Sequence, residues 1–232
     1  MKNKNKTGKP HKTLFLFVFS ILFFSGLSFV RAADPELIIT WKADNFYPAS
    51  YAGKAIPSFG TKVYFAVEAI QDGKLLDISK ALIEWRKNGE RIRRGEGQKE
   101  ALVVFNETDQ TSFVSASVSF GEKTIEKNVS IPIISPKLVL EIPYLNNVVP
   151  KNTDISILAM PYFFNAKSFN DFSFSWQIGG IKKGTGSDNK IIINTGNPRI
   201  GTDQLVTISG YIQNKRSLME IVKTQAKLFI GE

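Results

Sequence analysis

The sequence predicts an all-β protein made of two tandem antiparallel β-sandwiches that follow an N-terminal signal helix. Apolar and polar residues alternate in short runs, so that Phe172, Phe174 and Trp176 share one face of a segment whose serines share the other. Glycine, asparagine, aspartate and proline separate these runs, which is typical of sandwiches and barrels. The order of the runs then repeats along the chain, and this repeat predicts two copies of one unit.

Residues 1–32 have the layout of a secretory signal peptide. Five lysines and no acid precede an apolar, charge-free segment of seventeen residues at 14–30, and small residues follow it. We expect cleavage after Ala32, which leaves Ala33 at the new N-terminus. The alternative is an uncleaved signal anchor, although about 20 residues are usual for a membrane span. In both cases the lysines stay in the cytoplasm and the remaining chain is exported.

Two sandwich domains follow, at residues 33–135 and 136–232. The strands expected in the first copy are 36–41, 61–70, 81–90, 101–105, 111–120 and 124–133. The strands expected in the second copy are 137–142, 153–163, 172–181, 190–194, 204–212 and 220–230. We place the join near Pro136, because Pro132 and Pro136 limit strand pairing and stiffen a short linker.

A tryptophan marks the third strand of each copy. Trp85 and Trp176 lie 91 residues apart, and each is followed by a basic pair and then a Gly-x-Gly segment. We interpret these segments, Gly95–Gly97 and Gly184–Gly186, as turns. Each tryptophan lies on the apolar face of its alternating strand, so we expect both to be structural core residues rather than sugar-stacking platforms.

The segments WRKNGE (85–90) and WQIGGI (176–181) combine a central-strand tryptophan with an Asn-Gly or Gly-Gly turn. In this they resemble strand C of the immunoglobulin-like and PKD-like domains of bacterial surface proteins, over roughly residues 35–232. The chain has no cysteine, so it differs from the disulfide-linked antibody domains. The resemblance implies an exported adhesion, spacing or carbohydrate-binding role, and it transfers no catalytic residue.

The net charge of +9 at first suggests a partner such as nucleic acid or an anionic surface. Six of the 30 basic residues and no acid lie in residues 1–32, so the rest of the chain carries only +3. By domain, this charge divides into −1 for residues 33–135 and +4 for 136–232. We therefore expect no nucleic-acid binding.

The exported part of the chain lacks the residues of the common catalytic and metal sites. His11 is the only histidine and lies in the signal segment, and there is no cysteine. Ser-His-Asp and Cys-His catalysis and His-ligated zinc are therefore excluded. No pair of carboxylates stands out from turn and strand-face positions, as glycoside hydrolysis would need. We expect no catalytic residue, no cofactor and no metal, and predict that the protein is not an enzyme.

The least expected stretch is the long connection 44–60 between the first two strands. It carries Phe46, Tyr47, Tyr51 and Phe59 beside two prolines. Aromatic residues on a long loop predict an exposed contact surface for a partner. The alternative is that Tyr47 and Tyr51 fold back to cap an open end of the sandwich, or pair as an extra edge strand.

These features predict an exported, non-enzymatic protein that acts as an adhesion, spacer or assembly module, extracellular or associated with a bacterial cell envelope. Its partner would be a protein or glycan at the envelope, met by loops or by strand addition at exposed edges. It would touch the membrane only through an uncleaved N-terminal segment. The alternative is a carbohydrate-binding module of the cell surface, which predicts coplanar exposed aromatic side chains on one sandwich face.

Overall fold

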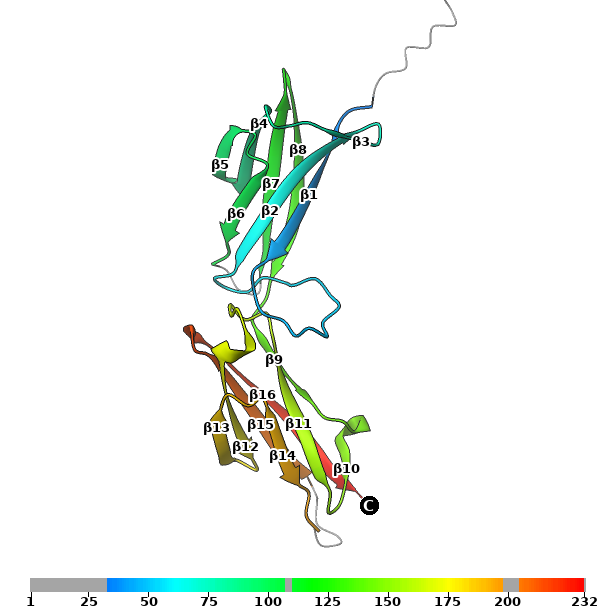
Figure 1. Cartoon of the computed structure of the whole chain (residues 1–232), viewed down its shortest axis with the longest axis vertical. Coiled ribbons are helices and arrows are strands. Elements are labelled where there is room, and N and C mark those ends of the chain that lie inside the picture. The colour runs from blue at the N-terminus through cyan, green and yellow to red at the C-terminus, as the bar shows by residue number, and fades with distance from the viewer. Residues whose placement is uncertain (1–32, 107–109, 198–204, 232) are drawn as a thin grey trace, which may run out of the picture.

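The computed structural model describes residues 33–106, 110–197 and 205–231. The expected signal segment lies outside these residues, so its cleavage after Ala32 stays a prediction. The described residues form two elongated β-sandwiches arranged end to end (Figure 1). Each has its own hydrophobic core, built between Leu37 and Ile133 in the first and between Leu138 and Leu228 in the second.

The first sandwich packs two four-stranded sheets together. In one sheet, β2 (Lys62–Gln71) pairs with β1 (Glu36–Ala43), β3 (Lys74–Leu76) and β6 (Glu100–Val104). The other sheet contains, in spatial order, β5 (Glu90–Glu96), β4 (Leu82–Lys87), β7 (Gln110–Phe120) and β8 (Lys123–Ile133). Every one of these pairings is antiparallel.

The second sandwich has a three-stranded and a five-stranded sheet. The smaller sheet contains β14 (Lys190–Asn194), β11 (Asp154–Tyr162) and β9 (Lys137–Glu141). The larger contains β10 (Val148–Pro150), β16 (Ser217–Gly231), β15 (Leu205–Asn214), β12 (Phe172–Ile178) and β13 (Ile181–Gly186). The strand β10 pairs in parallel with β16 and is absent from the sequence expectation, because three residues are too few to show alternation.

Short 3-10 helices precede two strands of the second sandwich. These are η1 (Leu145–Asn147) before β10 and η2 (Phe169–Asp171) before β12. Within the described ranges, no helix has the length and apolar character needed to cross a membrane.

The two sandwiches share most of their strand pairings, although β3 and β10 each have no counterpart in the other domain. Trp85 lies opposite Arg93 on one neighbouring strand, and Trp176 lies opposite Gly184 in the same way. A β-bulge follows the tryptophan in both domains. The sheets place β4 and β12 at the position of strand C in an immunoglobulin-like sandwich. The prediction of an all-β, tandem sandwich fold is therefore confirmed, while a specific PKD-like relationship stays a prediction.

Two expectations about turns need correction. The third strands end earlier than expected, at Lys87 and Ile178, because the Asn-Gly and Gly-Gly pairs that follow have positive φ and reverse the chain. In the first segment only Gly97 lies in a turn, with φ of 64°, because Gly95 belongs to β5, and in the second segment Gly184–Gly186 lies inside β13. The interpretation of the second Gly-x-Gly segment as a turn is wrong, because glycine also adopts extended backbone without strain.

Both tryptophan rings lie in the cores. Trp85 has 0% of its surface exposed and Trp176 has 5%. The indole N–H of Trp85 donates a hydrogen bond to the Gln98 carbonyl oxygen at 2.8 Å. The N–H of Trp176 is buried and has no hydrogen-bond partner in the described part of the chain. The two domains therefore differ in the hydrogen bonding of the tryptophan that they share.

Candidate functional site

The long loop 44–60 lies at the junction between the two sandwiches (Figure 1). A hydrogen bond from the Asp44 N–H to the Lys62 carbonyl oxygen, at 2.8 Å, ties it to β2, and one from Asn45 Nδ2 to the Ile56 carbonyl oxygen, at 2.7 Å, closes the loop on itself. The loop also contacts the linker, whose Ile134 N–H donates to a loop carbonyl oxygen at 3.0 Å. It is therefore an ordered part of the junction.

Phe46 reaches from this loop into the second domain. Its N–H donates to the Phe164 carbonyl oxygen and its own carbonyl oxygen accepts from the Phe163 N–H, both at 2.7 Å. Its ring packs edge-on against Phe172, with centroids 5.1 Å apart, and lies 6.1 Å from Phe169. All of these rings except Phe163 belong to the second hydrophobic cluster. A first-domain side chain therefore completes the second core.

Tyr51 adds further aromatic contacts between the loop and the second domain. Its ring lies 5.7 Å from Tyr162 and 5.5 Å from Phe163, both at the end of β11, and 5.8 Å from Tyr47. Phe163 has a φ of 65°, a backbone region that is uncommon for a bulky residue. Its backbone hydrogen bond to the loop holds that conformation in place. Aromatic pairs of this kind contribute about 0.5–1.5 kcal/mol each beyond the burial of their area.

Asn165 links three segments through polar contacts. Its Oδ1 accepts from the Thr61 hydroxyl at 2.7 Å, and its Nδ2 donates at 2.6 Å to the Phe59 carbonyl oxygen and to Glu220. Its backbone N–H also donates to the Glu220 carboxylate at 3.1 Å, and its carbonyl oxygen accepts from Asn214 Nδ2 at 3.1 Å. Both amide hydrogens are thus used, which fixes the first-domain loop against the β15–β16 hairpin.

Charged groups strengthen the same region. Lys167 of the second domain forms an ion pair with Asp44 of the first. Asp171 accepts hydrogen bonds from the backbone N–H groups of Lys167 and Ser168, at 2.9 and 3.1 Å, and from Arg216 Nε at 2.7 Å. The Lys167 N–H, followed by the Arg216 guanidinium, holds the pKa of the Asp171 carboxyl below its usual value. No group of three or more metal-ligating side chains occurs among the described residues.

The four aromatic residues predicted as a contact surface fall into two pairs. Phe46 and Tyr51 contact the second domain, so the contact they make lies within the chain. Tyr47 and Phe59 keep 38% and 55% of their surface exposed, and a partner surface on these two stays a prediction. Neither alternative considered from the sequence included a loop that closes the end of the next domain. The residue pattern within a loop does not predict which domain the loop will contact.

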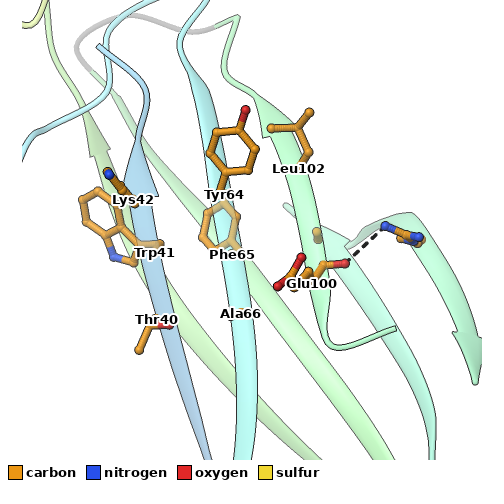
Figure 2. A pocket seen from close by; sticks show the side chains of 10 residues that line it. Thr40, Trp41, Lys42, Tyr64, Phe65, Ala66, Glu100 and Leu102 are labelled. Carbon is orange, nitrogen blue, oxygen red and sulfur yellow. Dashed lines mark hydrogen bonds between the residues drawn. The ribbon is translucent and has the colours of Figure 1, made fainter. Parts of the chain in front are cut away.

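A shallow depression of about 580 Å³ lies on the outer face of the sheet that contains β1, β2 and β6 (Figure 2). Tyr64, with 51% of its surface exposed, lies between Lys42 of β1 and Leu102 of β6 in the strand register. Ala66 and Glu100 form the next row, and the small alanine leaves room there. The depression offers one exposed ring beside charges of both signs, which suits a polar ligand such as a single sugar ring.

No family model and no curated protein matches this sequence. Solved structures of similar fold include the fibronectin(III)-like modules of Clostridium thermocellum CbhA, at 10% identity and a TM-score of 0.30, over 82% of this chain and 94% of that chain. The three N-terminal domains of the bacteriophage RB49 outer capsid protein Hoc match at 14% identity and a TM-score of 0.44, over 85% of this chain and 59% of that chain. The ectodomain of mouse nectin-like molecule 4 matches at 10% identity and a TM-score of 0.34, over 86% and 64%. At identities this low, the likenesses say nothing about what this chain binds.

Proposed function

We propose that this chain is an exported, non-enzymatic module of a bacterial cell envelope, acting as a stiff spacer that presents surfaces for adhesion or assembly. The observation that carries the proposal is the domain junction. Tandem domains move relative to one another by default, because their interfaces are usually small and polar. Here Phe46 of the first domain belongs to the second core, and Asn165 bonds to both domains. Two domains held in this way move as one unit.

Small-angle X-ray scattering tests the stiffness of the junction. The sample is residues 33–231, which contain both cores and every described strand. We expect one extended conformation for this protein, and a broader distribution of shapes for a variant that combines Phe46→Ala with Asn165→Ala. The matched control is Phe59→Ala, because that ring is exposed. A wild-type protein that scatters as a mixture of interdomain angles would contradict the proposal.

Export is tested separately by cell fractionation with N-terminal sequencing. A mature protein that begins at Ala33 supports a released module, and an intact Met1 outside the cytoplasm supports a membrane tether. Protein found only in the cytoplasm, with its first 32 residues intact, would rule out an envelope role.

A carbohydrate-binding module is the second candidate function, favoured by the depression around Tyr64. Another exposed ring, Phe113, lies beside a polar depression of about 460 Å³ that includes Arg86 and Glu126. These rings stand on opposite outer faces of the first sandwich, because β2 and β7 belong to different sheets. They therefore do not form the single flat platform that this function predicts. Glycan retention by the wild type that is lost in Tyr64→Ala, on an array, would favour this second function.

A further inference from the structure

One side of the second sandwich is open between two sheet edges. β14 is the last strand of the smaller sheet and β13 is the last strand of the larger. Lys183 of β13 and Ile191 of β14 line the same two hollows, which measure about 470 and 230 Å³. Ile178, Val206 and Ile230 line the larger hollow, and all three are only partly buried against the core. Apolar interior is therefore accessible from this side.

The free edge of β14 presents unpaired backbone groups. The Thr195 N–H and the Asn189 carbonyl oxygen both bond to residues at the β11 side, at 3.1 and 2.8 Å. Backbone groups alternate in direction along an antiparallel strand, so those of Lys190, Ile192 and Asn194 point away from β11. The Lys190 N–H already donates to the Asp188 carboxylate, so the open part of the edge is at Ile192 and Asn194. A second strand can pair with this edge.

The first sandwich closes the matching side with three side chains. Arg93 of β5 donates to the Glu100 carbonyl oxygen and Lys87 of β4 donates to the Val104 carbonyl oxygen, both at 3.4 Å. These two carbonyl groups point away from β2, as does that of Leu102 between them. Phe105, at the end of β6, is fully buried and lies 5.0 Å beneath the Lys87 ammonium. The edge is thus capped at two of its three outward carbonyl groups, and the interior beside it is filled.

The second sandwich lacks all three closing side chains. The shared strand registers place Gly184, Ile178 and Thr195 at the positions of Arg93, Lys87 and Phe105, in that order. Glycine and isoleucine have no side-chain donor. The Thr195 hydroxyl donates to the Pro150 carbonyl oxygen at 2.7 Å and does not fill the interior.

The buried indole of Trp176 is an independent observation that points to a missing ligand, because its N–H has no acceptor in the described part of the chain. Trp176 lines the smaller hollow, and its N–H has no partner within the described ranges, whereas the Trp85 N–H is bonded to the turn between β5 and β6. A buried donor without an acceptor loses its hydration without replacement, which destabilises the fold. A ligand that offers an acceptor there, or that moves the turn between β13 and β14 onto the indole, would recover the lost stability.

We propose that this β13–β14 groove binds an extended segment of a partner protein, which adds a strand to the free edge of β14. The proposal rests on the assembly role given above and specifies its partner. Unpaired backbone groups of a strand edge are best met by another extended backbone. The β13–β14 groove is lined by Ile178, Lys183, Ile191, Ile193, Val206, Leu228 and Ile230.

The charge around the groove defines the partner segment. Lys182, Lys183 and Lys190 are exposed along the two edges. Asp188, the only acid between residues 172 and 202, already accepts the Lys190 N–H at 2.9 Å. The second domain carries a net +4. The fitting segment therefore alternates apolar residues, which enter the groove, with acidic residues, which face the lysines.

The test uses residues 33–231 and a short synthetic peptide that alternates valine with glutamate. A second peptide with lysine in place of glutamate is the charge control. Binding is followed by calorimetry and by the NMR signals of the Ile192 N–H and the Trp176 indole N–H. We expect the acidic peptide alone to bind and to shift both signals.

The arginine that caps the β6 edge in the first domain suggests a substitution that tests the proposal. Gly184→Arg restores the residue type found at Arg93, and a Cβ at Gly184 meets no atom within 4 Å. We expect this variant to bind the acidic peptide about tenfold more weakly, which corresponds to the loss of one or two edge hydrogen bonds. Gly184→Ala, which adds no donor, is the matched control and should bind as the wild type does. Thermal melts by circular dichroism check that both variants are folded.

Any of three outcomes would contradict the proposed peptide binding. These are peptide affinity in folded Gly184→Arg equal to that of the wild type, NMR shifts confined to the first domain, and self-association through β14 with no peptide binding. Scattering on the same samples separates this proposal from the proposed function. A flexible junction with intact peptide binding counts against the stiff spacer alone. A stiff junction without peptide binding counts against the groove alone.

Discussion

Replacing Phe46 with alanine should uncouple the unfolding of the two domains. Truncation of a fully buried phenylalanine costs about 3–5 kcal/mol. Phe46 is only half-buried, and its two backbone hydrogen bonds to the second domain survive the change, so we expect a loss of about 2 kcal/mol. That loss shifts the equilibrium between docked and undocked domains about thirtyfold.

Differential scanning calorimetry, with tryptophan fluorescence as a second probe, measures the effect. Trp176 reports on the second domain, and Trp41 and Trp85 report on the first. We expect one cooperative transition in the wild type and two in Phe46→Ala, with the Trp176 signal changing at the lower temperature. The control Phe59→Ala removes an exposed ring and should cost less than about 0.5 kcal/mol.

Equal melting of the two variants would refute the reasoning. It would mean that the contacts of Phe46 with Phe172 and Phe169 add nothing to the second core. Two separate transitions already present in the wild type would refute it as well, because the junction would then transmit no stability between the domains.

Two further predictions concern the tryptophans and the junction carboxylate. Trp85→Phe should cost about 1 kcal/mol more than Trp176→Phe in urea denaturation, because only the Trp85 N–H has an acceptor to leave unpaired; equal costs would show that the indole hydrogen bond contributes nothing. The folded pKa of Asp171 is lowered, so its stabilisation is fully present above the unfolded pKa of about 3.9 and is lost as pH falls through the folded pKa. Asp171→Asn should therefore be less stable than the wild type at neutral pH and lose less stability on acidification. Urea midpoints measured across that acidic range check this, and parallel pH profiles of the two proteins would contradict it.

The alternation of residues predicted the strands well because burial on one face of a sheet is a local constraint. The run that contains Phe172, Phe174 and Trp176 alternates over its whole length, and the structure has a strand there. Strand ends were less accurate at Lys87 and Ile178, because the positive φ of the following residues decides where the chain reverses. The three-residue strand β10 has no detectable period, and its pairing with β16 depends on residues far away in the chain.

The amino-acid sequence by itself determined the sandwich class, the repeat and the identity of the two core tryptophans, since each follows from periodicity within a few residues. Only the tertiary structure decided that Phe46 completes the core of the other domain, and that Gly184 stands where the first domain has Arg93. The physical reason is the same in both cases. Docking and edge closure depend on which distant backbone segments meet in space, and two sequences with the same alternation can differ completely in that respect.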